Sequence, residues 1–222
     1  GTTMGCNKAK SLIEIRKSIN FIDCIIDQIE TLNNKYKISI PLLLMNSIYT
    51  EKDTKDYLRK RNSKVEIFCF NQKFLPRLSS NNLEPITNDT EIKNISEWYP
   101  PGHGLVYSSL YNSPHYQKLK DRGIEYLFIS NVDNLAAIFD ECIYNFIYEN
   151  KYDFCLELTK KTLLDVKGGT FVLYNNKRIL LEKAQVEEEN LDDFYSIQKF
   201  KYFNTNNLWI KLDKLSEDID MD

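Results

Sequence analysis

The sequence predicts a doubly wound α/β fold with a mostly parallel sheet. Short, continuously apolar runs, of which PLLLM at 41–45 is the clearest, have the pattern of strands that are buried on both faces of a parallel sheet. These runs alternate with segments of helical periodicity, and that order is typical of α/β proteins. With 222 residues, of which 42% are apolar, the chain can bury the core of one large domain.

The first predicted element is a helix over 20–36, because its apolar residues recur at helical spacing. Asn20 precedes it and belongs to the residue types that cap helix N-termini. The strand at 41–45 comes next, and Thr50 is then expected to cap a charged helix over about 51–61. This part of the chain therefore predicts a helix, a buried strand and a second helix in succession.

The rest of the chain predicts mainly strands. The polar stretch 79–97 predicts a long loop. Asn134 is expected to open one more helix, whose apolar face runs from Leu135 to Ile147. The further strands are predicted at 65–70, 126–130, 154–159, 169–174, 178–184 and 207–212.

Charge and cysteine usage narrow the classes of partner. The net charge is −3, so the chain lacks the broad cationic surface that a general nucleic-acid binder needs. No apolar run approaches the roughly 20 residues of a membrane-spanning helix. The five cysteines are an odd number and form no CxxC pair, which fits free thiols in a reducing compartment. We therefore expect a cytoplasmic protein with no nucleic-acid or membrane partner.

The glycines are concentrated in three short segments. Six of the seven lie in GTTMG, PPGHG and KGG, each in a connection between predicted elements. Glycine is needed where φ is positive or where a backbone approaches a ligand closely. In open α/β sheets, ligands bind beyond the carboxyl ends of the strands. The three segments are therefore either tight turns or ligand-binding loops, and their composition alone leaves both interpretations open.

A longer series of motifs resembles a known family. GTTMGCNKAKS, FNQKFLPR, WYPPGHG, SNVDNL, VKGGT and FNTNNLWI, in this order, closely resemble the eukaryotic-type UDP-glucose pyrophosphorylase (UTP–glucose-1-phosphate uridylyltransferase) family over essentially the whole chain. The resemblance implies a Rossmann-like nucleotide-sugar transferase fold. It places residues 1–222 in the central part of the catalytic domain, truncated at both ends and without the family's C-terminal β-helix domain. The implied reaction is reversible uridylyl transfer from UTP to glucose-1-phosphate, which gives UDP-glucose and pyrophosphate and uses Mg²⁺.

The resemblance also assigns roles to residues of the nucleotide half. Gly1 matches the last glycine of the family's phosphate-binding loop, and Lys10 matches its catalytic, phosphate-neutralising lysine. Ala9 stands where the family usually has proline, which is expected to leave the approach to Lys10 less rigid. Gln72 matches the glutamine that contacts the uracil edge, with one amide donor and one acceptor available for the base.

The PPGHG segment completes the nucleotide half. Gly102 is expected to bring the backbone against the uracil, and His103 to face the phosphate or the sugar. The two prolines before them restrict the turn in advance of binding. His115 matches no motif of the family and is expected to lie on the surface.

The metal and the hexose are assigned to later motifs. Asn131, Val132 and Asp133 match substrate-binding positions, and Asp133 is expected to hold Mg²⁺ against phosphate oxygens. From the residue pattern alone, Asp133 could instead cap the following helix. The positions that match those around the hexose in the family are Gly169, Glu182 and Asn206.

Two alternatives to the implied function stay open. The related UDP-N-acetylhexosamine pyrophosphorylases tend to have asparagine at the position of His103, which favours glucose here. The second alternative is a truncated, non-catalytic nucleotide-sugar-binding module. The family's first loop glycines and a distal lysine have no counterpart in these 222 residues. We therefore expect the isolated chain to bind UDP-glucose weakly and to turn over little.

Overall fold

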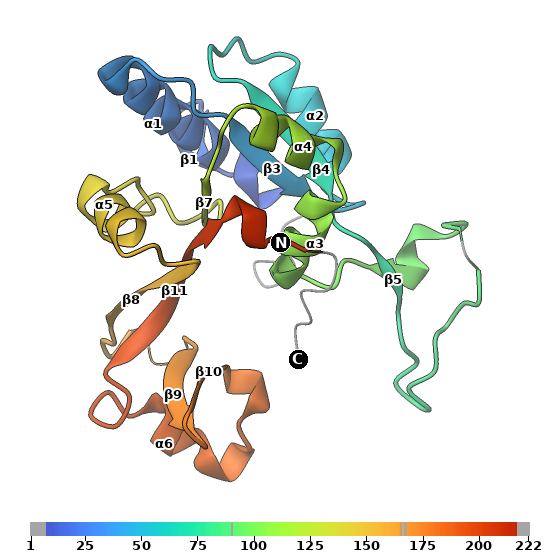
Figure 1. Cartoon of the computed structure of the whole chain (residues 1–222). Helices are drawn as coiled ribbons and strands as arrows, with labels where there is room; N and C mark the ends of the chain where they lie inside the picture. The colour runs from blue at the N-terminus through green and yellow to red at the C-terminus, as the bar shows by residue number, and fades with distance from the viewer. Residues whose placement is uncertain (1–7, 90, 165, 167, 217–222) are drawn as a thin grey trace. The chain divides into compact units, whose positions relative to one another are not determined.

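The computed structural model describes residues 8–89, 91–164, 166 and 168–216 (Figure 1). Its architecture is mixed α/β, with several small sheets and short helices. The chain divides into two compact units, the first made of Gly1–Glu125 with Asp213–Asp222 and the second of Tyr126–Leu212. No helix among the described residues is long and apolar enough to cross a bilayer.

A parallel β-α-β unit forms the centre of the first compact unit. Strand β3 (Leu42–Asn46) is followed by helix α2 (Glu51–Leu58) and strand β4 (Ile67–Asn71). The two strands pair in parallel from Leu42 opposite Ile67 to Asn46 opposite Asn71. Parallel strands need a crossover of a dozen or more residues, and the segment that contains α2 supplies it.

Helix α1 (Phe21–Tyr36) confirms the helix predicted at 20–36. Asn20 Oδ1 accepts from the backbone N–H of Asp23, and Asp23 Oδ2 accepts from that of Asn20, both at 3.1 Å. This reciprocal cap satisfies two backbone donors that a helix start leaves without partners. Ile22 and Ile26 are fully buried, and the Tyr57 hydroxyl of α2 donates to Asp23 at 2.8 Å. The cap therefore also ties α1 to α2.

The other face of β4 carries two helices that the sequence analysis did not predict, α3 (Val106–Tyr111) and α4 (Pro114–Asp121). Successive strand residues point to opposite faces. Ile67 accordingly packs with α1, whereas Phe68 stacks on the His115 ring of α4 with centroids 4.8 Å apart. The β3–β4 pair thus has helices on both faces, and Figure 1 shows α1, α2 and α4 around it. The surface position expected for His115 is wrong, because its ring is partly buried on Phe68.

The second compact unit is built on an antiparallel sheet. Its strand order is β7-β11-β8, so β11 pairs with both of its neighbours. Strands β9 and β10 form a separate antiparallel hairpin. The bounds are Tyr126–Ile129 for β7, Phe154–Lys160 for β8, Thr170–Tyr174 for β9, Lys177–Leu181 for β10, Tyr202–Lys211 for β11, Glu141–Glu149 for α5 and Leu191–Tyr195 for α6.

The remaining strands are short and antiparallel. They are β1 (Glu14–Arg16), β2 (Ile19–Asn20), β5 (Leu75–Pro76) and β6 (Trp98–Tyr99). An isolated bridge joins Leu78, just before the predicted loop at 79–97, to Pro85 within it, and a 3-10 turn at Ile95–Glu97 ends the loop. Among the described strands, β3–β4 is the one parallel pair, so the mixed α/β class is confirmed and a mostly parallel sheet is not.

The helix start predicted at Asn134 is wrong, and the cap predicted at Thr50 has no side-chain hydrogen bond to its helix. Asn134 does not open a helix: α5 begins at Glu141, and Asp140 Oδ1 accepts from the backbone N–H groups of Cys142 and Ile143 at 2.8 and 3.1 Å. Thr50 does precede α2, yet its hydroxyl oxygen accepts from the backbone N–H of Ser47 rather than from the helix. The Thr50 side chain thus belongs to the turn before α2, and the Asn134 side chain donates to Asn207 Oδ1 of β11 at 3.2 Å.

The predicted strands are present, but several begin or end at other residues than predicted. Strand β4 begins two residues later than expected, at Ile67. Strand β10 ends at Leu181, because residues Lys183–Gln185 form a 3-10 turn. Strand β11 begins at Tyr202 rather than at 207, since its polar first half pairs with β8.

Candidate functional site

The end of β4 brings together two of the predicted nucleotide-binding residues. The Gln72 backbone N–H donates to the carbonyl of Asn46 at 2.9 Å, which continues the parallel pairing by one residue. Its side-chain Oε1 accepts from the backbone N–H of Gly102 at 3.2 Å. An amide that accepts through its oxygen still carries two N–H donors, which suit carbonyl oxygens such as those of a uracil. Gln72 and Gly102 therefore form one polar contact within the first unit.

The backbone conformation of the PPGHG turn requires glycine at position 102. Gly102 has φ 131° and ψ −174°, a conformation that other residues rarely adopt. A Cβ added there would meet no atom within 4 Å, so the backbone at Gly102 borders open space. His103 is exposed and begins a 3-10 turn at His103–Leu105. Upstream, the Tyr49 hydroxyl donates to the carbonyl of Trp98 at 2.8 Å and fixes the start of this segment.

Lys10 begins a 3-10 turn, Lys10–Leu12, next to the buried Ala9. The Ala9 backbone N–H donates to Asp53 Oδ2 of α2 at 3.4 Å, a long and therefore weak hydrogen bond. Proline has no N–H and could not make this contact. Alanine in place of the family's proline therefore allows one backbone hydrogen bond to α2. Gly1 lies outside the described residues.

The SNVDN segment after β7 is a closed turn in the second unit. The backbone N–H of Asn134 donates to the carbonyl of Asn131 at 3.0 Å, which is the hydrogen bond of a β-turn. Val132 and Asp133 are the central residues of that turn, and both are partly buried. Because Asp140 caps α5, the alternative role of Asp133 as the cap of that helix is excluded.

Two asparagine pairs join this turn to β11. The Asn206 Nδ2 group donates to Asn131 Oδ1 at 3.0 Å. The Asn134 Nδ2 group donates to Asn207 Oδ1 at 3.2 Å. Strand β11 already pairs with β7 further along, from Leu208 opposite Ile129 onward. The asparagine pairs therefore extend the link between the two strands into the loop that carries Asp133.

A bulge in β11 explains why the motif reads NTNN. Asn204 pairs with Leu158 of β8, yet Asn207 pairs with the very next residue, Glu157. The two residues between, Thr205 and Asn206, have no partner in the ladder. Asn206 has φ 61°, in the left-handed region that asparagine tolerates better than most side chains. Bulges redirect side chains, and this one turns Asn206 toward Asn131.

Gly169 and Glu182, both assigned to the hexose, are in direct contact. A Cβ built on Gly169 would lie 2.3 Å from Glu182 Oε1, so no side chain fits there while Glu182 keeps its position. The Gly169 carbonyl accepts from the backbone N–H of Asn204 at 2.8 Å. The Glu182 backbone N–H donates to Gln185 Oε1 at 2.8 Å, which fixes the turn after β10. The pair is thereby linked to the strand that carries Asn206.

The residues present offer an incomplete metal site. Among the described residues, no three or more histidine, cysteine, aspartate or glutamate side chains are grouped so that they could enclose a metal ion. Mg²⁺ commonly takes only one or two protein carboxylates and completes its shell with phosphate oxygens and water. The Asp133 carboxylate, at the end of a strand, fits that donor set when a phosphate-bearing substrate is bound.

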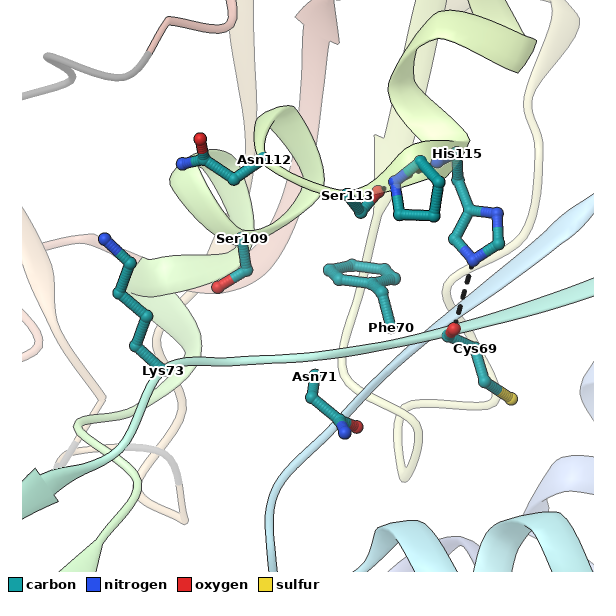
Figure 2. A pocket seen from close by; sticks show the side chains of 9 residues that line it. Cys69, Phe70, Asn71, Lys73, Ser109, Asn112, Ser113 and His115 are labelled. Carbon is teal, nitrogen blue, oxygen red and sulfur yellow. Dashed lines mark hydrogen bonds between the residues drawn. The ribbon is translucent and has the colours of Figure 1, made fainter. Parts of the chain in front are cut away.

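A cavity that the sequence pattern does not predict lies beside β4. It has a volume of about 270 Å³ and is lined by Cys69, Phe70, Asn71, Lys73, Ser109, Asn112, Ser113, Pro114 and His115. Figure 2 shows the Phe70 ring below the start of α4, with the His115 ring bonded to the Cys69 carbonyl at 3.1 Å. Gln72 is not in the lining, so the cavity is separate from the Gln72–Gly102 contact. It depends on α3 and α4, for which the sequence pattern gave no signal.

Fold and contacts together define a mixed α/β protein whose candidate ligand-binding residues lie in loops that follow or interrupt its strands. The family model described as UTP–glucose-1-phosphate uridylyltransferase matches residues 1–222. The chain therefore belongs to the UTP–glucose-1-phosphate uridylyltransferase family.

Curated relatives and solved structures agree with this assignment. The chain is 48% identical over 221 residues to the UTP–glucose-1-phosphate uridylyltransferase of Hordeum vulgare and 48% identical over 223 residues to that of Solanum tuberosum. The matches cover 99% and 100% of the chain but 46% of each relative, so the chain spans about half the length of these relatives.

Among solved structures, a UDP-glucose phosphorylase from Trypanosoma brucei matches with a TM-score of 0.85 and 34% identity, over 96% of this chain and 48% of that one. A mutant of UDP-glucose pyrophosphorylase from Leishmania major in complex with UDP-glucose matches with a TM-score of 0.81 and 32% identity, over the same shares of the two chains.

Proposed function

We propose that residues 1–222 are the catalytic-domain portion of a longer enzyme that transfers a uridylyl group from UTP to glucose-1-phosphate, with UDP-glucose and pyrophosphate as products. The observation that supports this most is that three of the family's motif contacts form within the units: Gln72 with Gly102, Asn131 with Asn206, and Gly169 with Glu182. Sites for a base and for a sugar are what this reaction requires.

In the proposed reaction, a phosphate oxygen of glucose-1-phosphate attacks the α-phosphorus of UTP and pyrophosphate leaves. Gln72 and the Gly102 backbone hold the uracil, while Asn206, Glu182 and Gly169 hold the hexose. Such chemistry depends mainly on positioning and on charge stabilisation of the phosphates. Lys10 supplies one cation, and His103 faces the phosphate or the sugar.

Asp133 is the residue that would hold Mg²⁺, aided by the turn that Asn131 and Asn134 close. Bound Mg²⁺ would offset negative charge on the phosphates. The protein's own contribution is to keep the Asp133 carboxylate at a fixed place at the end of β7.

Two further features belong to the proposal. The β3–α2–β4 unit, with helices on both faces, supports a doubly wound, mostly parallel sheet in the longer protein. Free thiols support a reducing, cytoplasmic location; those among the described residues are Cys24, Cys69, Cys142 and Cys155.

A uridylyl-transfer assay on the full-length protein that contains this chain tests the proposal. We expect UDP-glucose and pyrophosphate to form in equal amounts from UTP and glucose-1-phosphate. ³¹P NMR monitors both products. N-acetylglucosamine-1-phosphate in place of glucose-1-phosphate should give a much lower rate. A preference for the acetylated sugar would support the hexosamine alternative, and binding of both substrates without product would support the non-catalytic module.

Replacement of Gln72 by alanine should weaken UTP binding much more than glucose-1-phosphate binding. The change removes the contacts to the base and leaves the Gly102 N–H without its acceptor. Loss of buried polar contacts to a base typically costs about 1–3 kcal/mol, which is about 5–150-fold in affinity. The KM values of both substrates measure the effect. Gln117→Ala, on the exposed face of α4, is the matched control, and equal losses for both substrates would show that Gln72 is structural.

A further inference from the structure

Glu157 lies in the middle of β8 and joins no motif that the sequence analysis identified. It is partly buried, and both of its carboxylate oxygens accept hydrogen bonds from β11. Trp209 Nε1 donates to Oε1 at 2.7 Å, and Asn207 Nδ2 donates to Oε2 at 3.0 Å. Both partners are buried, with exposed fractions of 2% for Trp209 and 5% for Asn207. The carboxylate is thus held between two fixed donors.

The chemistry of these groups fixes the direction of a three-residue chain. A carboxylate can only accept, so Asn207 must present its Nδ2 group to Glu157. Its Oδ1 atom then faces the other way and accepts from Asn134 Nδ2 at 3.2 Å. Asn134 must in turn present its N–H group, which sets the orientation of its amide beside Asp133. Glu157 therefore determines which way two successive amides point.

We propose that Glu157 is a positioning residue of the uridylyl-transfer site, which acts through Asn207 and Asn134 to hold the Asp133 turn in its working geometry. The turn itself is closed by the backbone hydrogen bond from Asn134 to Asn131. A change in the orientation of Asn134 therefore acts on the same residue that closes the turn. The role in catalysis rests on the proposed function of Asp133, whereas the effect on the turn does not.

Glutamine at position 157 tests the proposal with almost no change of shape. The glutamine amide has a single acceptor oxygen, for which the Trp209 and Asn207 donors compete. Either Asn207 reverses and Asn134 must follow, or one donor loses its acceptor. Loss of an outer contact that orients a metal ligand typically costs about 10–100-fold in metal affinity or activity. Glu157→Gln should therefore raise the Mg²⁺ concentration needed for half-maximal rate by about that factor, while KM for glucose-1-phosphate changes little.

A second substitution should restore the chain of hydrogen bonds. Trp209→Phe removes the competing donor, so that glutamine can turn its oxygen to Asn207 and its N–H group away. The double variant should then need the same Mg²⁺ concentration as Trp209→Phe alone. Glu149→Gln, at the exposed end of α5, is the matched control and should behave as the unchanged protein.

Metal dependence and amide hydrogen exchange, measured on the same full-length samples, test the role of Glu157. Glu157→Gln should speed exchange in peptides covering 130–135 and leave those of α5 unchanged. If Glu157→Gln speeds this exchange but the unchanged full-length protein shows no uridylyl transfer, Glu157 does position the turn and the proposed function is wrong. In an active protein, an unchanged Mg²⁺ requirement, or a raised one that Trp209→Phe does not relieve, would overturn the role of Glu157.

Discussion

Replacement of Asp133 by asparagine is expected to abolish metal-dependent turnover of the full-length protein while the fold is kept. Asparagine fits the same turn, because Asn131 and Asn134 close it through backbone atoms that the change does not touch. The lost group is the carboxylate charge at the end of β7. Removal of one charge-stabilising group commonly costs about 10²–10³ in rate. Initial rates across a Mg²⁺ titration, with a thermal unfolding curve for each sample, measure the effect.

Asp140→Asn is the matched control for this experiment. It removes a carboxylate seven residues further along the chain, and asparagine caps a helix about as well as aspartate. The control should therefore keep both its rate and its metal requirement. Activity of Asp133→Asn that equals the control at every Mg²⁺ concentration would remove Asp133 from the metal site.

The second large effect is expected from Gly169→Ala. The new Cβ would lie 2.3 Å from Glu182 Oε1, so the glutamate must move. The atoms it meets are the far end of a flexible side chain, and the free energy of unfolding should therefore change little. The displaced carboxylate would lose the contacts with the hexose that we propose for it, at a typical cost of about 1–3 kcal/mol, or about 5–150-fold in KM for glucose-1-phosphate. Steady-state kinetics with each substrate varied in turn measure this change.

The neighbouring glycine provides a contrasting control. A Cβ on Gly168 would lie 2.7 Å from a ring carbon of Phe203. Gly168→Ala should therefore lower the thermal unfolding midpoint, whereas its effect on KM should be smaller than that of Gly169→Ala. The combination of Gly169→Ala with Glu182→Ala should add little to either single change, because both remove the same contact. Fully additive losses, or a change in the KM of UTP alone, would contradict the pairing of Gly169 with Glu182.

Local features of the fold could be predicted because their causes are local. The start of α1 needs only a capping residue, Asn20, before an apolar helical face. The direction of strand pairing has no such local cause, because alternation and apolar content do not distinguish parallel from antiparallel partners. The position of β11 between β7 and β8 was therefore missed.

The candidate site, too, could be predicted only where a local motif marked its residues. Family motifs predicted Gln72, Gly102, Asn131 and Asn206, and the structure brings them together in pairs. Glu157 was missed because FCLELT has the composition of an ordinary strand. Its partners are 50 and 52 residues away, and a bulge in β11 sets the register that places Asn207 opposite Glu157 and Trp209 two residues further along β11. A contact decided by register cannot be recognised from either segment alone.

We propose that the groups which recognise UDP-glucose reside in these 222 residues. Calorimetric titration of UDP-glucose into the isolated chain, after circular dichroism has confirmed that it is folded, tests this claim most directly. We expect saturable binding that is weaker than that of the full-length protein and that Gln72→Ala reduces. A folded chain that gives no heat of binding, at concentrations that saturate the full-length protein, would contradict the account.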